Sequence, residues 1–551
     1  MPKTKAPVKS RKKAAATASE AEPILSRKEQ RKLERARAQN RQAVIQSLAI
    51  VLGIATVLAA IASFVLEPKL GVAAGLAIAC LGLSYRFPRF AIYGFIFYLP
   101  LSGTVTYALG GSPILQLAKD AIFFPALLRV ILFCKEYNQR LIFPQAMRIP
   151  FIIFMTYCTA VLLFVNGAQQ ISAQGEMPIP LGILGLKALV GYLLLITCIH
   201  YLIRTKADLY FLLRTQVVFI IICCGLGFVQ YLMLTTGICP PTQGTGDALF
   251  KASLESRCLV GGALLYSPQF GVIRLPGTFV APWQWGWFLI SSTFFAFGTA
   301  FNDRSLIWRT VGIFSMVMVG VMAVVSGQRI ALALVPASTI LLLLMTGQLL
   351  KPKRFLPIGI GLALILVFLA QQYPDVLNDS FQSLVGRWNA APPTDFITHQ
   401  LQWSIDQQRG FLGRGLGRAT NAARIFGKVS LVETYHSKVL FEIAPLGLVL
   451  LLSLFTVLVI TSFKAYRSLK DPSLRGYGAS MFTFVLFISY FPYYYPLDVD
   501  PVNVYYWLAA GIALKLPDLD RQERMKGGLG KKLSKKELKQ LKKSQQAIEF
   551  R

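Results

Sequence analysis

The chain has 551 residues, of which 54% are hydrophobic and only 15% are charged, with a mean hydropathy of +0.53. These values are typical of a polytopic membrane protein and exclude an ordinary soluble domain of this length. The formal net charge is +31, but much of it lies in two terminal tails, so the charge alone does not indicate nucleic-acid binding.

The two tails are short and strongly basic. Residues 1–42 hold thirteen Lys and Arg against four Glu, and residues 515–551 hold twelve against five acidic residues. Such segments favour the anionic headgroups of a cytoplasmic leaflet. We therefore interpret 1–42 and 517–551 as basic cytoplasmic tails, and no motif in them indicates a nucleic-acid partner. The first 25 residues lack an apolar core, so we expect the first membrane helix to direct insertion.

Apolar runs occupy most of residues 43–516, which we predict to be a transmembrane domain. A helix needs roughly 20 residues to cross a bilayer. The runs are continuous and do not alternate with period two, which favours an all-α fold over a β-barrel. The sequence predicts 12–14 transmembrane helices, at 43–65, 69–84, 90–109, 113–134, 149–165, 181–203, 210–236, 283–301, 307–326, 329–350, 354–371, 438–463, 477–494 and 502–516.

The charged residues between these runs predict the orientation. Lys and Arg accumulate in short cytoplasmic loops. In a count of fourteen helices every basic cluster falls on the same side as the tails, so both termini are predicted to be cytoplasmic. Segments 166–180 and 495–501 carry acidic residues and no Lys or Arg, as expected outside. The basic clusters are Arg86/Arg89, Lys135/Arg140/Arg148, Arg204/Lys206, Arg304/Arg309, Lys351/Lys353/Arg354 and Lys464/Arg467/Lys470/Arg475.

Two longer loops, at 237–281 and 372–437, are predicted to lie outside. The first contains Cys239 and Cys258, which an oxidising compartment can join in a disulfide, although free thiols remain an alternative. The other six cysteines fall in or beside apolar runs, where a thiol behaves as a small apolar group. No Cys or His spacing indicates a metal site, and no Walker loop or nucleophile elbow occurs, so we predict no metal and no cofactor.

Several outside arginines run against the positive-inside trend. Arg274 precedes the eighth run, Arg329 begins the tenth, and the long loop holds Arg387 and then Arg409, Arg414, Arg418 and Arg424. One guanidinium group can donate two parallel hydrogen bonds to phosphate oxygens, and a helix N-terminus adds free backbone N–H groups. A convergent set at the outer headgroup level therefore indicates a site for a lipid pyrophosphate.

Each arginine also has a structural alternative. Arg387 beside Trp388 can anchor the chain at the interface, and Arg329 can form a buried ion pair. The glycine-rich run that carries Arg414 and Arg418 can be a flexible turn, because glycines without a strand-to-helix context are a weak phosphate signal.

The three histidines differ in setting. His200 lies at a cytoplasmic helix end, where an interfacial role is the simpler interpretation. His399 lies in the long loop, on a predicted amphipathic helix. His436 stands where that loop meets the twelfth run, just after Glu433, and can accept a proton from an incoming hydroxyl near neutral pH. We take His436 as the candidate catalytic residue, with Glu433 as an auxiliary candidate.

Six short motifs follow one another along the chain. They are RLPGTF at 274–279, Pro282, SGQR at 326–329, Arg387 with Trp388, GRGLG at 413–417, and His436 followed by Glu442 and Gly447. Their order resembles the O-antigen ligase and polymerase superfamily, over roughly residues 180–465. Three positions depart from the family pattern, with Ser437 after the histidine, Gln328 before the arginine and Trp283 after the proline. The basic tails also resemble, more loosely, cyanobacterial membrane proteins of hormogonium polysaccharide biosynthesis.

The resemblance implies an all-α fold of the glycosyltransferase C type in a bacterial plasma (inner) membrane. It implies metal-independent, inverting transfer of a glycan from an undecaprenyl-diphosphate-linked donor to an acceptor hydroxyl on a glycan or lipid. In that scheme Arg274 and Arg329 hold the pyrophosphate, Arg387 assists, and His436 activates the acceptor. Arg414 and Arg418 are auxiliary candidates.

Other functions stay open. Polymerases and ligases share the donor chemistry, and so does protein O-glycosylation, so these are not separated. A transporter or lipid-linked-glycan flippase is an alternative, although its charged residues should lie at mid-membrane on broken helices in two repeated halves. A noncatalytic component of a polysaccharide-synthesis or export complex is another, with the tails binding partners.

Overall fold

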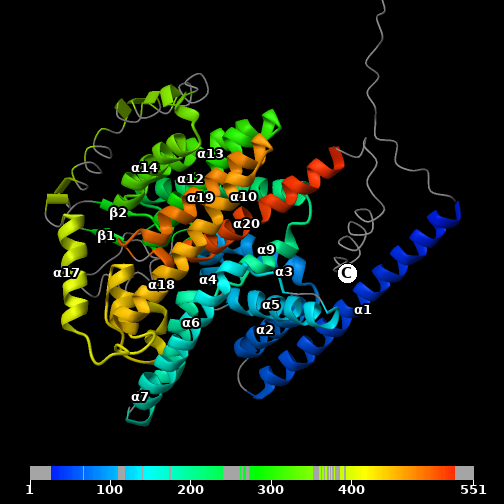
Figure 1. Ribbon diagram of the computed structural model, residues 1–551, viewed down its shortest axis with the longest axis horizontal. Coiled ribbons are helices and arrows are strands. Elements are labelled where there is room, and N and C mark those ends of the chain that lie inside the picture. Colours follow the sequence, from blue (N-terminus) through cyan, green and yellow to red (C-terminus); the bar gives the residue numbers. More distant parts are fainter. Residues whose placement is uncertain are drawn as a thin grey trace, which may run out of the picture. The chain divides into compact units, whose positions relative to one another are not determined.

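The computed structural model of the chain is mainly helical (Figure 1). The contacts between residues divide the chain into two compact units, residues 1–79 and residues 80–550. The candidate sites lie in the second unit. The structure describes residues 27–65, 68–108, 118–138, 141–172, 175–239, 258, 261, 265–267, 272–350, 392–494 and 496–527, with scattered positions from 359 to 389.

The described elements follow the predicted runs closely. Two short strands, β1 (Leu265–Ser267) and β2 (Val272–Arg274), form an antiparallel pair within the 237–281 loop. The longer helices are α1 (Arg27–Val65), α2 (Pro68–Arg86), α3 (Pro88–Tyr98), α5 (Ala118–Glu136), α6 (Gln145–Val161), α8 (Pro178–Val190), α10 (Lys206–Thr235), α12 (Pro282–Asn302), α13 (Leu306–Val325), α14 (Arg329–Met345), α17 (Pro393–Asp406), α18 (Tyr435–Ser468), α19 (Pro472–Tyr490) and α20 (Val502–Gly527). The shorter ones are η1 (Leu99–Leu101), α4 (Ser102–Ala108), the π-helical η3 (Leu162–Asn166), α7 (Gly167–Ser172), α9 (Leu195–Leu202), η4 (Gln348–Leu350), η5 (Asn421–Phe426) and η6 (Pro496–Asp498).

The prediction of an all-α polytopic membrane protein is confirmed in its coarse form. Among the described residues, six helices are long and apolar enough to cross a membrane, or seven if α8 and α9 are one span bent by 49°. The count of 12–14 spans stays a prediction. The run at 354–371 and the tails 1–26 and 528–551 lie largely or wholly outside the described residues.

Helix α12 shows why hydropathy alone undercounts interior spans. It has 21 residues, which is about 31 Å of helix and close to a bilayer's hydrocarbon thickness. Every side chain from Trp285 to Asn302 is buried, and α12 packs against α10, α13, α14 and α19. Because no face of α12 meets lipid, it tolerates the hydroxyl and amide groups that lower its hydropathy.

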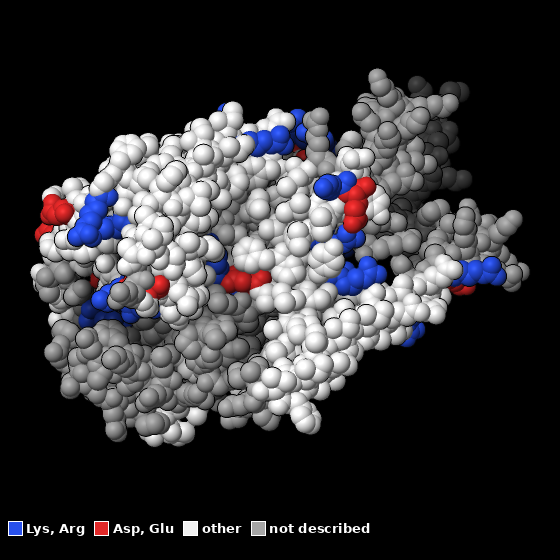
Figure 2. All heavy atoms as spheres, turned by 90° about the horizontal axis from the view of Figure 1, so that it is seen from below, with Lys and Arg blue, Asp and Glu red and all other residues white. Residues whose placement is uncertain are grey.

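On the face seen in Figure 2, charged side chains form a few small groups separated by wide uncharged surface.

Consecutive helices of this bundle run in opposite directions, which defines two ends. The basic end holds Arg304, Arg309 and Arg475, at the last residues of α12 and the first residues of α13 and α19. The loop end holds the first residues of α12, α14, α18 and α20. Residues 407–434 pack there against α18 and α8. From Phe441 to Tyr466, α18 extends roughly 35 Å, so the two ends are farther apart than a hydrocarbon layer is thick.

A break in α18 organises the loop end. Pro445 lacks an N–H and its ring clashes with the preceding turn, so Ile443 and Ala444 leave helical geometry, Ala444 with φ of 60°. The carbonyls freed by the break accept hydrogen bonds from the loop. The backbone N–H of Arg414 donates to Phe441 (3.1 Å) and that of Gly415 donates to Glu442 (3.0 Å). The loop thus supplies donors that the helix has lost.

The spacing of glycines in GRGLG fits this docking. Gly413, Gly415 and Gly417 all have positive φ, at 83°, 103° and 82°. A Cβ on Gly413 would lie 2.6 Å from the carbonyl oxygen of Glu442, and one on Gly417 would lie 2.1 Å from the carbonyl oxygen of Leu181 in α8. The glycine-rich run is therefore a packed backbone clamp, and its interpretation as a flexible turn was wrong.

We expect Gly417→Ala to destabilise the protein, because the new methyl group meets a carbonyl oxygen at a backbone angle that L residues rarely adopt. A loss of about 1–3 kcal/mol is expected from the strain alone. Thermal unfolding of the purified protein in detergent measures the change. Gly225→Ala in α10 is the matched control, since nothing lies within 4 Å of its Cβ position. Equal melting temperatures for the two variants would contradict the clamp.

Candidate functional site

Arg274 lies at the loop end, at the last position of β2. The next residue, Leu275, donates its N–H to the carbonyl of Ser326 (3.0 Å). Ser326 ends α13, and the turn Gly327–Gln328 leads directly into α14. The segment that carries Arg274 is therefore hydrogen-bonded to the helix break that precedes Arg329.

Arg329 is the first residue of α14 and is half-buried. The turn before it packs on the start of α12, where a Cβ on Gly286 would lie 3.5 Å from Cβ of Gln328 and 3.3 Å from Ile330. The missing side chain at Gly286 thus lets the Arg329 turn approach the central helix closely.

His436 is the second residue of α18 and reaches the same region through a different set of contacts. Tyr435 donates its backbone N–H to the carbonyl of Pro492 (2.9 Å), and Thr434 pairs with Tyr493 in a β-bridge. Trp287 of α12 donates its indole N–H to the carbonyl of Tyr494 (3.2 Å). The first turns of α12 therefore join the segments that carry His436 and Arg329.

One nitrogen of the His436 ring is buried without a hydrogen-bond partner among the described residues, as are the hydroxyl groups of its neighbours Thr434 and Tyr435. This nitrogen is Nε2, and it is shielded from solvent. Buried polar atoms are nearly always paired, so such an atom needs an explanation. A bound hydroxyl group is one that suits a catalytic base.

Two other predicted residues, Arg387 and Glu433, belong to the long loop. Arg387 lies outside the described residues. Glu433 immediately precedes the β-bridge and donates its backbone N–H to the side-chain oxygen of Gln400 (3.2 Å). Convergence of the side chains of Arg274, Arg329 and His436 on one ligand stays a prediction.

A second feature of the loop end is a cavity of about 880 Å³ beside the break in α18. Four basic side chains line it, together with the exposed ring of Phe411. Phe441, five positions after His436, belongs to its wall, whereas Arg274, Arg329 and His436 do not. The basic residues are Arg409, Arg414, Arg418 and Lys428.

The two auxiliary arginines in this wall are held by protein groups. Arg418 forms an ion pair with Glu176 (2.8 Å) and donates twice to the side-chain oxygen of Gln169 (3.0 and 2.7 Å). The hydrogen bond from Arg418 holds the pKa of Glu176 below its ordinary value. Arg414 donates to the backbone and side-chain oxygens of Gln407 (2.6 and 2.9 Å). Both arginines fix the loop and also line the cavity.

Cys239 and Cys258 are joined in a disulfide, with Cα atoms 5.6 Å apart. The bridge ties the end of α10 to the 237–281 loop, and Gln230 of α10 donates to the carbonyl of Cys258 (3.2 Å) and accepts from the N–H of Gly277 (3.1 Å). These contacts hold the loop close to the RLPGTF segment that carries Arg274.

The sequence reasoning missed a set of buried lysines at the loop end. Lys438, with 1% of its side chain exposed, forms an ion pair with Asp498, with 6% exposed. Two residues further on, Asp500 pairs with Lys119 of α5. The signal in the sequence is a lysine directly before the apolar residues 439–441, since a charged group at the start of a membrane helix needs a partner as an arginine does.

The network continues into α8. Lys187 pairs with Asp120, which also accepts from the hydroxyl of Tyr192 (2.6 Å). Both Lys119 and Lys187 lie over the Tyr192 ring, at 5.6 and 5.8 Å from its centre. The described residues include no group of three or more His, Cys, Asp or Glu placed to hold a metal ion.

Comparison of the chain with protein-family models found no match, and comparison with curated proteins found no significantly similar sequence.

We expect Lys438→Met to destabilise the protein, because it leaves Asp498 buried without a counter-charge. Removing one partner of a buried ion pair costs about 3–5 kcal/mol, whereas removing both costs less. The double variant Lys438→Met/Asp498→Leu should therefore melt at a higher temperature than the single variant. Lys464→Met, at an exposed position of the same helix, is the control and should leave the melting temperature unchanged. A single variant as stable as this control would contradict the assigned role of the pair.

Proposed function

We propose that the protein transfers a glycan from a lipid-diphosphate-linked donor, of the undecaprenyl type, to an acceptor hydroxyl at the outer leaflet of a bacterial plasma membrane. It does so as a polymerase or ligase of exopolysaccharide or O-antigen type. The observation that carries the proposal is the buried, unpartnered Nε2 of His436, on a segment joined through α12 to the one that carries Arg329. The resemblance of the motif order to the O-antigen ligase and polymerase superfamily supports it.

The reaction is a single displacement with inversion. The acceptor oxygen attacks the anomeric carbon while its proton passes to Nε2 of His436. The bond from the anomeric carbon to the diphosphate oxygen breaks, and the lipid diphosphate leaves with the bonding electrons. Arg274, Arg329 and Arg387 stabilise the charge that develops on that leaving group, so no metal ion is needed for this role.

The proposed base is shielded from water. Because Nε2 of His436 is not exposed, a hydroxyl that reaches it meets the activated donor in a water-poor site, which limits hydrolysis of the lipid diphosphate. The 880 Å³ cavity beside α18 has room for sugar units, with Phe411 as a stacking surface and Arg409 and Lys428 as polar contacts. In this proposal the loop end is extracytoplasmic, both termini are cytoplasmic and 12–14 helices cross the membrane in a glycosyltransferase C-like arrangement.

One observation favours a second candidate, a transporter or lipid-linked-glycan flippase. Helix α18 is broken and carries buried Lys438 and Glu442 next to the break, as transporter helices often do. These groups lie at the loop end, however, and not midway along the bundle. Uptake of a labelled glycan lipid by reconstituted vesicles, with no new glycosidic bond, would identify this function. A noncatalytic component of a polysaccharide-synthesis complex would tolerate loss of His436.

We expect His436→Ala and Arg329→Ala to reduce glycan transfer at least 100-fold. General base catalysis contributes roughly 10²–10⁴, and loss of one donor that stabilises developing charge costs roughly 10²–10³. Gel analysis of cellular glycans measures chain length in strains that carry each variant. Accumulated single repeats would indicate a polymerase, and free long polymer without its acceptor a ligase.

His399→Ala is the matched control for the histidine, because His399 is exposed on α17. Arg467→Ala, at an exposed position of α18, is the matched control for Arg329→Ala. Both controls should leave the glycan pattern unchanged. Normal glycans from stable, membrane-inserted His436→Ala and Arg329→Ala proteins would overturn the proposed transferase.

A further inference from the structure

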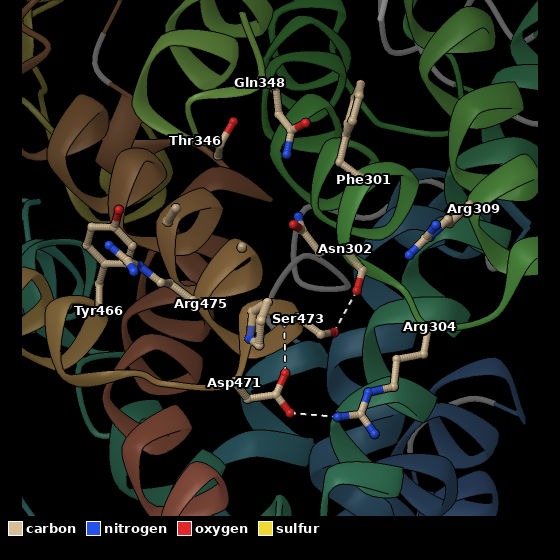
Figure 3. A pocket seen from close by; sticks show the side chains of 13 residues that line it. Phe301, Asn302, Arg304, Arg309, Thr346, Gln348, Tyr466, Asp471, Ser473 and Arg475 are labelled. Atoms are coloured by element: carbon tan, nitrogen blue, oxygen red, sulfur yellow. Dashed lines mark hydrogen bonds and ion pairs between the residues drawn. The ribbon is translucent and has the colours of Figure 1, made fainter. Parts of the chain in front are cut away.

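A separate cavity of about 550 Å³ lies at the basic end of the bundle. It is formed by the end of α12, the start of α13, the end of α14 with η4, the end of α18 and the start of α19 (Figure 3). None of the residues proposed for glycan transfer lines it. Cavities of about 300–1,000 Å³ are the usual size for small-molecule sites.

The cavity carries more positive than negative charge. Its one carboxylate, Asp471, forms ion pairs with Lys206 (2.5 Å) and Arg304 (2.7 Å) and also accepts from the backbone N–H of Ser473 (2.8 Å). Burial opposes ionisation of Asp471, but the contact with Lys206 holds its pKa below the ordinary value. Asp471 is thus fully engaged and leaves the remaining arginines of the wall without a carboxylate.

Arg309 and Arg475 are those remaining arginines. Arg309 donates its Nε–H to the backbone oxygen of Asp303 (2.6 Å), whose carboxylate is taken by Arg214 through two hydrogen bonds of 2.8 Å. Arg475 lies over the ring of Tyr466, 6.0 Å from its centre. Within the described chain neither Arg309 nor Arg475 pairs with a carboxylate, and Figure 3 shows them on opposite sides of the cavity.

The wall also contains a buried amide that lacks a partner. Gln348 is 7% exposed, and its side-chain oxygen has no hydrogen bond within the described residues. In Figure 3 its amide points toward Asn302 at the centre of the cavity. This oxygen can only accept a hydrogen bond, so it calls for a donor such as a hydroxyl group. Two guanidinium groups without counter-charge, together with this acceptor, describe a ligand that is both anionic and hydroxylated.

We propose that this cavity binds a phosphate ester that carries hydroxyl groups, with the positive charge of Arg309 and Arg475 attracting the phosphate and a hydroxyl donating to Gln348. Guanidinium forks match phosphate oxygens, which explains the arginines in place of lysines. The glycerol headgroup of an anionic phospholipid and a soluble sugar or glycerol phosphate share this chemistry. The basic end is also where an anionic leaflet surface is expected.

Binding to the full-length protein in detergent tests the proposal. Two probes are used, phosphatidylglycerol in mixed micelles and soluble glycerol 3-phosphate, with phosphatidylcholine as the lipid blank. Binding is measured as the shift in melting temperature with ligand concentration. For the lipid it is also measured as the number of lipid molecules that stay bound to the protein in native mass spectrometry. We expect Arg309→Gln/Arg475→Gln to weaken binding at least tenfold, because the cavity wall loses the two positive charges that have no carboxylate partner among the described residues.

Two further variants sharpen the test. Gln348→Leu should weaken phosphatidylglycerol more than phosphatidic acid, which lacks the glycerol hydroxyls. Arg467→Gln, at an exposed arginine of the same end, should bind like the native chain. If the pocket variants lose only the binding of phosphatidylglycerol, the ligand is a lipid. If they lose only the binding of glycerol 3-phosphate, the ligand is soluble. The proposal is overturned if the pocket variants and Arg467→Gln bind both probes equally well. Because the readout is binding, the result is independent of glycan transfer.

Discussion

The loop end depends on one constraint, which is that backbone carbonyls freed inside a membrane helix must find donors within the protein. Pro445 opens α18, and each exposed carbonyl has a partner from elsewhere in the chain. The GRGLG segment serves two of them, and the hydroxyl of Tyr157 on α6 donates to the third, Ile443 (2.8 Å). The break, the glycines and α6 are therefore one unit, and none of the three can change alone.

The contacts at the break in α18 also position residues 403–420 of the long loop. Glu442, fully buried in the opened turn, accepts from the N–H of Ala419 (2.8 Å) and the hydroxyl of Thr420 (3.0 Å). Gln408 donates to the carbonyl of Leu440 (2.5 Å), and Trp403 of α17 stacks on Phe441 at 5.4 Å. This part of the loop is thus a layer bonded to α18, so the cavity beside it has a defined wall.

The sequence predicted the helices well, because long apolar runs have a direct physical meaning in lipid. The helix predicted around His399 is present as α17, although Leu401 and Ile405 on it are exposed. A bend inside one apolar run was harder to predict. The bend between α8 and α9 cannot be recognised in a run that reads as one continuous apolar segment at 181–203.

The candidate site was less predictable than the fold. The order of motifs indicated Arg274, Arg329 and His436, but that α12 joins their segments could not be predicted, because Trp287 and Gly286 look like ordinary apolar positions. The GRGLG run was ambiguous for a similar reason. Close backbone approach and phosphate binding both demand glycine, and only the three-dimensional partners, such as Leu181, separate the two.

The contacts along α18 favour His436 over its neighbours for the proposed role of a base. Lys438 is bound to Asp498, and one oxygen of Glu442 holds the loop in place, so a proton moved to or from either group would weaken contacts that the fold needs. His436 lies before the break, and its Nε2 is not used in any described contact. Charging and discharging that nitrogen leaves the clamp intact. A residue that must change its protonation state in each cycle is best placed where the fold does not depend on it.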